Sequence, residues 1–316
     1  FDHALGSQPH LICFSVKANS NLAVLKVFAR ERSGFDIVSG GELFRALKAG
    51  AEAKKIVFSG VGKSRREMEE ALTAGILMFN VESESELAVL NEVAGKMGKK
   101  APIALRVNPD VDPQTHPYIS TGMKKSKFGI EIKRAMENYR KALSFPHLEI
   151  VGIDCHIGSQ LTSVARFVDA LSRLREYLDR VLTGALKSRG GSVRYLDLGG
   201  GLGIRYKDEE PPHPEEYARA ILQAMSGLDI TLVLEPGRVI VGNAGILVTE
   251  VLYLKDTEEK KFVIVDAAMN DLIRPALYGS YQSIRPVREQ PGEKIVPDVV
   301  GPICESGDFF AKDREI

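Results

Sequence analysis

The sequence has few cysteines, no excess of either charge and no long hydrophobic run. Three cysteines in 316 residues, Cys13, Cys155 and Cys304, are too few and too scattered for a disulfide framework or a zinc site. Lysine plus arginine and aspartate plus glutamate both number 42, so the formal net charge is zero, which argues against a general nucleic-acid binder and gives no indication of a membrane surface. No signal peptide or run of membrane-spanning length is recognisable. We therefore expect a protein of the reducing cytoplasm.

The overall composition is that of an ordinary globular protein, with 44% hydrophobic and 27% charged residues. A length of 316 residues is enough for one large domain or two ordinary ones. The chain begins at Phe1 rather than at a methionine and stops in a charged tail, so we expect a fragment trimmed at both ends.

Short apolar runs alternate with amphipathic stretches along the first three quarters of the chain. The apolar runs predict strands at 11–16, 35–38, 56–59, 77–81, 103–108, 150–157, 195–198 and 232–235. The stretches between them predict helices at 21–30, 41–49, 64–73, 83–97, 133–143, 164–189 and 214–225. Strands that alternate with helices form parallel sheets, and eight such units in roughly 240 residues fit a closed (β/α)8 barrel of the TIM type. A doubly wound open sheet is the alternative.

The alternation stops after Gly237. Strand-like runs at 244–254, 261–266 and 296–300 follow, without a clear helix between them. We therefore predict two domains: a (β/α)8 barrel over residues 1–243 and a partial β-rich domain over residues 244–316.

Lys17 stands directly after the first apolar run, at the carboxyl end of a predicted strand. Burial of an ammonium group is costly, so a lysine in this place is paired, reaches solvent along its stem, or is held neutral for chemistry. A desolvated lysine has a lowered pKa and can form a Schiff base. Lys17 by itself favours the solvent-exposed alternative, because most lysines are exposed.

The carboxyl ends of barrel strands converge on one site, so the residues there are the candidates for function. In chain order they are Lys17, Asp36, Ser59, Glu82, Arg106, Asn108, His156, Ser159, the glycine run 199–203 and the segment Glu235-Pro236-Gly237-Arg238. The glycines would let the backbone approach an anion closely, and loops after strands seven and eight often hold phosphate; the alternative is a flexible turn. His156 has no HxH or HxxxH partner, so we expect no metal site.

A buried Glu235 must be paired, either with a protonated pyridine nitrogen or with Arg238. His156 could stack on an aromatic ring or be an ordinary core histidine. None of these features is decisive alone. Taken together, a Schiff-base lysine, a phosphate loop, a ring-stacking histidine and a buried carboxylate indicate pyridoxal phosphate.

Motifs spread over nearly the whole chain carry a resemblance to a known family. They are Ser15-Val16-Lys17-Ala18-Asn19, Phe35-Asp36, Ser126-Lys127-Phe128-Gly129, His156-Ile157-Gly158-Ser159-Gln160, the glycine run 199–203, Glu235-Pro236-Gly237-Arg238, Arg274-Pro275-Ala276-Leu277-Tyr278 and Gly301-Pro302-Ile303-Cys304-Glu305-Ser306-Gly307-Asp308. With these motifs the chain resembles the fold-type III, pyridoxal-phosphate-dependent decarboxylases of basic amino acids, and among them those that act on diaminopimelate.

The resemblance implies pyridoxal 5'-phosphate as the cofactor. Lys17 would bind its aldehyde as a Schiff base, His156 would stack on its ring, and Glu235 would pair with the pyridine nitrogen and keep it protonated. The remaining residues of the implied cofactor site are Asp36, Ser159, Gly200, Gly201, Gly237 and Arg238, of which Ser159 and the glycines would hold the phosphate.

The resemblance also implies the reaction, which is decarboxylation of meso-2,6-diaminopimelate to L-lysine and carbon dioxide, the last step of lysine biosynthesis. Arg238, Arg274 and Tyr278 would bind the carboxylate that is not lost. The enzyme would be a homodimer with shared active sites. Cys304 and Glu305 would reach into the partner subunit's site, where Glu305 would contact the distal amino group of the substrate and Cys304 would assist protonation.

Lys127 and Asp308 would pair across that dimer interface, the alternative being ordinary surface charge. The chain stops before a tyrosine that contacts the cofactor phosphate in this family, and it lacks the first strand of the β-domain, so we expect an incomplete site.

Three other functions stay open at this point. An ornithine or arginine decarboxylase of the same fold would need no arginine for a second carboxylate. A non-catalytic pyridoxal-phosphate carrier would need neither the segment with Cys304 and Glu305 nor the β-domain. A cofactor-free Schiff-base aldolase would leave His156 and Glu235 without a role.

Overall fold

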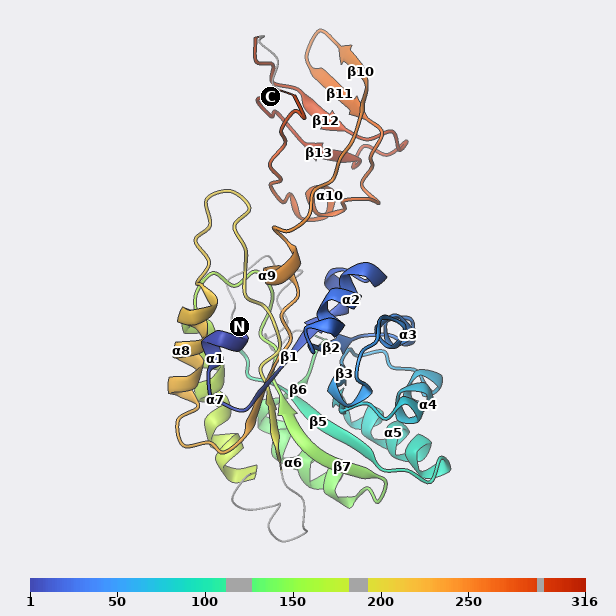
Figure 1. Ribbon diagram of the computed structural model, residues 1–316, viewed down its shortest axis with the longest axis vertical. Helices are drawn as coiled ribbons and strands as arrows, with labels where there is room; N and C mark the ends of the chain where they lie inside the picture. The colour runs from blue at the N-terminus through green and yellow to red at the C-terminus, as the bar shows by residue number, and fades with distance from the viewer. Residues whose placement is uncertain (112–126, 182–192, 289–292) are drawn as a thin grey trace. The chain divides into compact units, whose positions relative to one another are not determined.

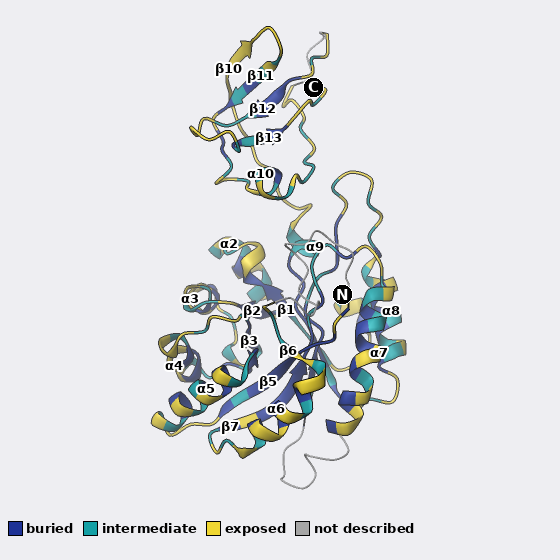
Figure 2. Ribbon diagram, turned by 180° about the vertical axis from the view of Figure 1, so that it is seen from behind, coloured by how far each residue is buried: buried dark blue, intermediate teal, exposed yellow. Residues whose placement is uncertain are grey.

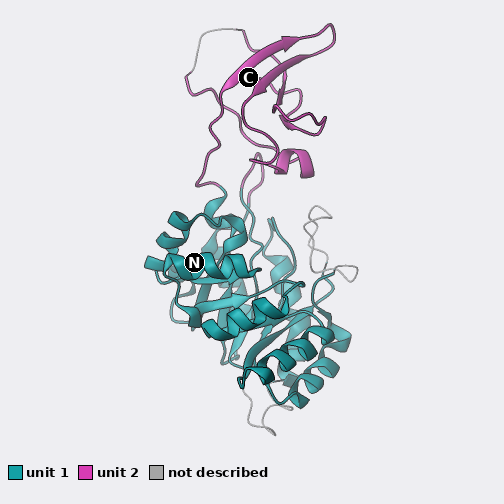
Figure 3. Cartoon of the chain, turned by 90° about the vertical axis from the view of Figure 1, so that its right-hand side faces the viewer, with its two compact units in different colours: residues 1–204, 211–242 teal, residues 205–210, 243–316 magenta. Residues whose placement is uncertain are grey.

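The computed structural model describes residues 1–111, 127–181, 193–288 and 293–316. The chain divides into two compact units, which Figure 3 colours separately: unit 1 is residues 1–204 and 211–242, and unit 2 is residues 205–210 and 243–316. Residues 205–210 belong to unit 2 although they lie between two segments of unit 1, a grouping that the sequence pattern did not predict.

Within the described residues, unit 1 is a closed barrel of parallel strands with helices around it (Figure 1). The barrel strands are β1 (His10–Ser15), β2 (Gly34–Ile37), β3 (Ile56–Phe58), β4 (Met78–Val81), β5 (Ala101–Asn108), β7 (Leu148–Asp154), β8 (Tyr195–Asp197) and β9 (Thr231–Leu234), and β6 (Ile130–Glu131) pairs with the end of β5. Strands are hydrogen-bonded in the order β4-β3-β2-β1-β9-β8-β7-β5, and β4 also pairs with β5, which closes the sheet. The predicted (β/α)8 barrel is confirmed, and the open-sheet alternative is wrong.

Helices cover the outside of the barrel. They are α2 (Leu22–Arg30), α3 (Gly40–Ala49), α4 (Arg65–Ala74), α5 (Glu84–Lys96), α6 (Ile132–Ser144), α7 (Ala165–Arg180) and α8 (Pro214–Ala224), with the short helices α1 (Asp2–Leu5) and α9 (Arg238–Val241) and the 3-10 turns η1 (Val16–Ala18) and η2 (Ala53–Lys55). A capping box begins α4, where Ser64 Oγ accepts the N–H of Glu67 and the Glu67 carboxylate accepts that of Ser64. Residues 182–189 of the predicted helix 164–189 fall outside the described residues.

The barrel interior is apolar below the site. Cys13, Val57, Met78, Ala104, Val151 and Val233, one from each of six strands, pack together and are fully buried. The outward-facing residues of the same strands are buried under the helices (Figure 2). Because both faces are covered, the strands are nearly continuous apolar runs, which is why the sequence predicted them. Polar side chains inside the barrel are therefore exceptions that need a reason.

Unit 2 is an open sheet of β10 (Val251–Asp256), β11 (Lys261–Val265), β12 (Asp298–Val300) and β13 (Phe309–Ala311), with the short helix α10 (Arg274–Tyr278). The strands predicted at 261–266 and 296–300 are confirmed as β11 and β12. The strand predicted at 244–254 is wrong in its first half, since residues 245–250 have no regular structure. The sequence did not predict α10 or β13, because five and three residues are too few for a periodic pattern.

The described residues contain neither a candidate membrane span nor a candidate metal cluster. In the parts of the chain that the structure describes, no helix has both the length and the hydropathy needed to cross a bilayer. Over the same residues, no group of three or more His, Cys, Asp or Glu side chains is arranged to hold a metal ion.

Candidate active site

Lys17 lies in η1, two residues after the last residue of β1, and its Nζ donates to Oδ2 of Asp36 at 2.6 Å. Its side chain is 49% exposed, whereas Asp36 on β2 is fully buried and also accepts a hydrogen bond from Ser15 Oγ at 2.9 Å. Desolvation opposes the charged amine, but Asp36 and Glu235 together outweigh it and raise the pKa of Lys17. Lys17 is thus a paired amine on the solvent side of a buried acid.

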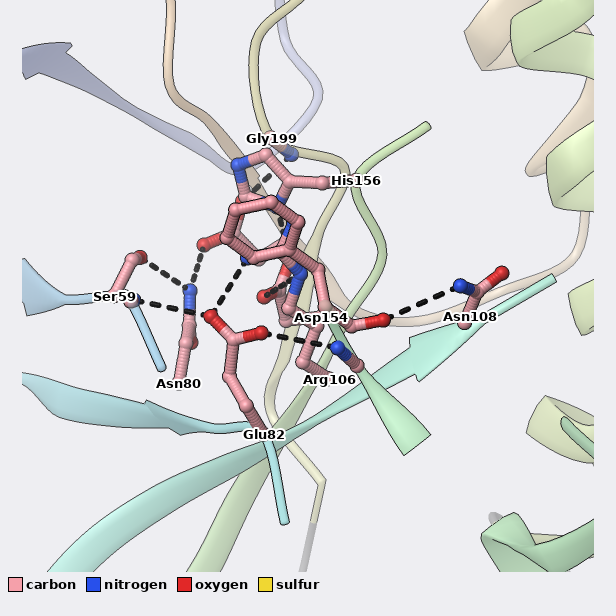
Figure 4. A network of polar contacts seen from close by, with 12 residues as sticks. Ser59, Asn80, Glu82, Arg106, Asn108, Asp154, His156 and Gly199 are labelled. Carbon is pink, nitrogen blue, oxygen red and sulfur yellow. Dashed lines mark hydrogen bonds and ion pairs between the residues drawn. The ribbon is translucent and has the colours of Figure 1, made fainter. Parts of the chain in front are cut away.

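Glu235, directly after β9, pairs with His156 in the barrel. Glu235 Oε2 contacts His156 Nε2, and His156 Nδ1 is 2.9 Å from Oδ1 of Asp154 at the end of β7. The imidazole is therefore held between two buried carboxylates (Figure 4). The sequence predicted Glu235 with a pyridine nitrogen or Arg238 as partner, and here its partner is the imidazole.

The ion pair controls the ionisation of both of its members. Burial disfavours the carboxylate of Glu235, but the charge of His156 outweighs burial and lowers the pKa of Glu235. Burial likewise disfavours the imidazolium, but Glu235 and Asp154 raise the pKa of His156 well above its usual range. Both shifts favour the charged forms of the pair, an ionised Glu235 and a protonated His156.

The glycine run after β8 lies against both partners. Gly199 and Gly201 have φ of +65° and +105°, a conformation that favours glycine. A Cβ on Gly199 would overlap the ring of His156, and one on Gly200 would overlap the carbonyl oxygen of Glu235. These positions require glycine because neighbouring groups approach the backbone closely, as expected of a loop that binds an anion through its N–H groups.

Arg238 begins α9 and donates from Nη2 to Ser159 Oγ at 2.9 Å. A Cβ on Gly237 would lie 3.0 Å from the Cβ atoms of Ala18 and Ser15. The structure thus brings the predicted cofactor residues at the ends of β1, β2, β7, β8 and β9 to one end of the barrel. The sequence did not predict a bond between Arg238 and Ser159.

Three buried polar residues of this site escaped the sequence analysis. Asn80 on β4 donates from Nδ2 to Asp197 Oδ2 at 3.1 Å and to Glu235 Oε1 at 3.2 Å, and Ser59 Oγ lies 3.2 Å from the same nitrogen (Figure 4). Asp197 on β8 and Asp154 on β7 are fully buried. Each of the three is a polar residue within an otherwise apolar strand, and this pattern in the sequence could have identified them.

A second buried pair borders the site. Arg106 donates from Nη1 to Glu82 Oε1 at 2.8 Å, and its Nε is 3.9 Å from Oδ2 of Asp154. Glu82 also accepts the N–H of Gly60 at 3.1 Å and that of Gly129 at 3.0 Å. Glu82 therefore ties the turn after β3 and the segment before β6 to the barrel.

Four residues predicted for substrate binding or for the partner's site lie in unit 2. Arg274 and Tyr278 lie on α10, with the guanidinium 4.9 Å from the tyrosine ring. Cys304 and Glu305 are exposed on the loop between β12 and β13.

Asp308 and Lys127, predicted to pair across a dimer interface, each have contacts within their own part of the chain. Asp308 is buried and accepts the N–H groups of Met269 at 2.6 Å and Ile303 at 2.8 Å, so the alternative of ordinary surface charge is wrong for it. Lys127 is 5.2 Å from the ring of Phe128. Ser126, from the same motif, lies outside the described residues.

Comparisons with known proteins agree with this geometry. Residues 1–242 match the family described as pyridoxal-dependent decarboxylase, pyridoxal binding domain. The chain is 57% identical to a diaminopimelate decarboxylase of Vibrio cholerae, an alignment that covers 100% of this chain and 75% of that protein. It is 58% identical to the Pseudomonas aeruginosa enzyme of the same name, with coverage of 99% and 74%. This chain belongs to the pyridoxal-dependent decarboxylases.

Solved structures of decarboxylases share the fold of this chain. The crystal structure of diaminopimelate decarboxylase from Helicobacter pylori complexed with L-lysine matches with a TM-score of 0.93 and 46% identity, over 99% of this chain and 77% of that one. The crystal structure of diaminopimelate decarboxylase from m. jannaschii in co-complex with L-lysine matches with a TM-score of 0.88 and 40% identity, over 98% of this chain and 71% of that one.

The residues of this decarboxylase fit pyridoxal phosphate, which is its family's cofactor. Lys17 offers a half-exposed amine, Glu235 is a carboxyl group inside the barrel whose lowered pKa favours its ionised form, and the glycine run supplies backbone without side chains of its own. The cofactor's aldehyde, ring nitrogen and phosphate need these three kinds of group.

Proposed function

We propose that this decarboxylase converts meso-2,6-diaminopimelate to L-lysine and carbon dioxide, with pyridoxal 5'-phosphate as its cofactor. The observation that carries the proposal is the identity of 57–58% to diaminopimelate decarboxylases over essentially the whole chain. A lysine/ornithine decarboxylase structure matches at 21% identity, which supports a common fold alone. The ornithine and arginine alternatives are therefore less favoured, as are the carrier and the aldolase.

Each residue of the barrel site has a task that follows from its surroundings. When bound, pyridoxal phosphate supplies a sink for the electron pair that carbon dioxide leaves behind. Lys17 is the amine that attaches the cofactor, and Asp36 orients it through the 2.6 Å hydrogen bond. Glu235 stays ionised because its pKa is lowered, so it can keep a proton on a ring nitrogen placed against it. His156, Ser159, Gly200, Gly201, Gly237 and Arg238 complete the proposed cofactor site.

Substrate recognition is proposed for Arg238, Arg274 and Tyr278. A guanidinium group binds a carboxylate through two parallel N–H donors, and a substrate that keeps one carboxylate after decarboxylation needs such a partner. The ring of Tyr278 next to the guanidinium of Arg274 limits how that side chain can turn.

We further propose a cytoplasmic homodimer in which Cys304 and Glu305 complete the partner's site. Both residues are exposed in unit 2, and Glu305 accepts the N–H of Gly307, which orders the loop that carries them. A test is to mix inactive Lys17→Ala protein with inactive Cys304→Ala protein. Shared sites predict that mixed dimers regain activity, about one site in two, whereas a monomer or separate sites predict none.

The experiment that tests the function is a carbon dioxide release assay with meso-diaminopimelate, ornithine and arginine side by side, on protein saturated with pyridoxal phosphate. We expect turnover of the first substrate only, and a visible absorption band that Lys17→Ala and Lys17→Arg both remove. Lys17→Arg is the matched control, because it keeps the charge near Asp36 but cannot form a Schiff base. Faster turnover of ornithine or arginine would overturn the substrate assignment.

A further inference from the structure

Asp197, the last residue of β8, has no task in the function proposed above although it lies at the centre of the polar network. It is fully buried. Its Oδ1 accepts the N–H of Gly199 at 2.9 Å, and its Oδ2 accepts Nδ2 of Asn80 at 3.1 Å. The same nitrogen of Asn80 is 3.2 Å from Glu235 Oε1. Asp197 therefore connects the first glycine of the loop, through Asn80, to Glu235.

The cations of the site have other partners. Lys17 pairs with Asp36, Arg106 pairs with Glu82, and His156 lies between Asp154 and Glu235. Within the described part of the chain, the ion pairs include none to Asp197, and the two hydrogen-bond donors named above are neutral. A buried carboxylate with neutral donors alone is costly, and the cost is avoided when the group takes up a proton.

The closeness of Asp197 and Glu235 points the same way. One nitrogen, Asn80 Nδ2, donates to Asp197 Oδ2 at 3.1 Å and to Glu235 Oε1 at 3.2 Å, so the two carboxyl groups are neighbours inside the barrel. Two ionised carboxylates at such a separation repel each other, which favours a proton on one of the two. Glu235 faces the imidazolium of His156, which favours its ionised form, so the proton belongs on Asp197.

Among the titratable groups around Asp197, Glu235 and Asp154 favour this assignment and His156 opposes it. The groups are Glu235 after β9, Asp154 and His156 at the end of β7, Cys155 between them, Cys13 on β1, and Tyr217 on α8. Burial, together with the charges of Glu235 and Asp154, raises the pKa of Asp197 well above its usual range, and His156 offsets only part of this.

We infer that Asp197 is a neutral carboxylic acid in the folded protein and a positioning residue, which holds the glycine loop at Gly199 and the carboxylate of Glu235 in one arrangement. Its O–H donates to Glu235, while its oxygens accept from Gly199 and Asn80. The effect on cofactor binding rests on the proposed function, whereas the protonation of Asp197 does not.

The decisive variant is Asp197→Asn. If Asp197 is neutral, an asparagine keeps its charge and shape: the amide oxygen accepts from Gly199 and the amide nitrogen replaces the O–H toward Glu235. Asn80 loses one acceptor and keeps Ser59 and Glu235. We expect the dissociation constant for pyridoxal phosphate to change by less than about threefold in Asp197→Asn and to rise by about tenfold or more in Asp197→Ala, which leaves buried donors unpaired.

Infrared difference spectroscopy of the full chain at neutral pH reads the proton directly. We expect a carbonyl band of a protonated carboxyl group in the wild type that Asp197→Asn removes. Glu82→Gln is the matched control: it removes another buried carboxyl group, paired with Arg106, and should leave the band in place. This spectrum needs no substrate, so it stands whether or not diaminopimelate is the substrate.

The pH dependence of unfolding gives a second readout. An acid whose pKa is raised on folding stays protonated in the folded chain and ionises in the unfolded one, so stability falls as pH rises above the unfolded value of about 3.9. For each pH unit, the ratio of folded to unfolded protein should therefore change by a factor up to about tenfold larger in the wild type than in Asp197→Asn. A wild type without the infrared band, or equal pH slopes for the two proteins, would overturn the inference.

Discussion

In unit 1 the candidate residues stand at the ends of a closed barrel and contact buried partners, whereas in unit 2 the candidates Cys304 and Glu305 are exposed on a loop of an open sheet. In the described part of unit 1 the eight barrel strands close on themselves, because β4 pairs with β5. In unit 2, β10 is an edge strand and all six of its residues are exposed.

This difference separates two ways of presenting functional groups. The barrel can hold carboxylates and an imidazole out of water because its hydrogen bonds and ion pairs satisfy them internally. Inside it, the charges of neighbouring groups overcome the effect of burial: His156 lowers the pKa of Glu235, and Glu235 and Asp154 raise that of His156. Residues on an exposed loop have ordinary chemistry until another surface covers them, which fits the proposal that Cys304 and Glu305 act in a partner's site. Substitutions of enclosed residues in unit 1 should therefore have larger effects than substitutions of exposed residues in unit 2.

The largest effect is expected for Arg106→Ala in the barrel. This change leaves Glu82 buried without its cation and should lower the free energy of unfolding by about 3–5 kcal/mol. Arg65→Ala is the control, because Arg65 pairs with Glu92 while both side chains are about half exposed, and its loss should cost less than about 1 kcal/mol. Urea unfolding followed by circular dichroism measures both. Equal losses would mean that the barrel network is not enclosed.

A smaller effect, on binding rather than folding, is expected for Arg274→Ala in unit 2. Loss of a charged hydrogen-bond partner for the substrate carboxylate should raise KM for diaminopimelate by about 10- to 150-fold, with kcat less affected. Arg314→Ala removes another guanidinium of unit 2, 4.0 Å from the ring of Tyr281, and should change KM little. An unchanged KM in Arg274→Ala would remove Arg274 from the proposed substrate site.

The ion pair between His156 and Glu235 should make stability depend on pH. The raised pKa of His156 adds stability that is complete below its unfolded value of about 6.5 and is lost as pH rises toward the folded value. The lowered pKa of Glu235 adds stability that is complete above about 4.3 and is lost as pH falls.

The measurement is urea unfolding of the wild type and of His156→Asn between pH 5 and 9. The advantage of the wild type should be greatest between pH values of about 4.3 and 6.5 and should shrink above that range, by up to about 1.4 kcal/mol per pH unit. A constant difference across this range would show that His156 does not titrate differently in the folded chain.

The smallest effect is expected on the exposed edge of unit 2. Leu254 on β10 is 69% exposed, so Leu254→Lys should change the free energy of unfolding by less than about 0.5 kcal/mol. Leu90→Ala, at a fully buried position of α5, should cost about 2–5 kcal/mol in the same assay. A loss above about 1.5 kcal/mol in Leu254→Lys would show that β10 is covered in solution. Unit 2 would then be less exposed than described, and less different from unit 1.

The residues show why the fold was easier to predict than the site. Barrel strands such as β4 and β9 are buried on both faces, so their apolar runs were visible in the sequence. Lys17 and Glu235 were predicted because each stands at the end of such an apolar run. Asn80 and Asp197 stand inside strands rather than after them, and their importance depends on a contact between residues 117 positions apart.

The sequence by itself determined the kind of chain this is. Its alternation of apolar runs and helices specified a barrel, and its motifs specified a lysine, a glycine loop and a carboxylate that suit pyridoxal phosphate. Only the tertiary structure decided which of these groups are partners: Glu235 with His156, Arg238 with Ser159, and residues 205–210 with unit 2. The physical reason is that ionisation and pairing depend on distances across the barrel and on burial, and neither is a property of neighbouring residues in the chain.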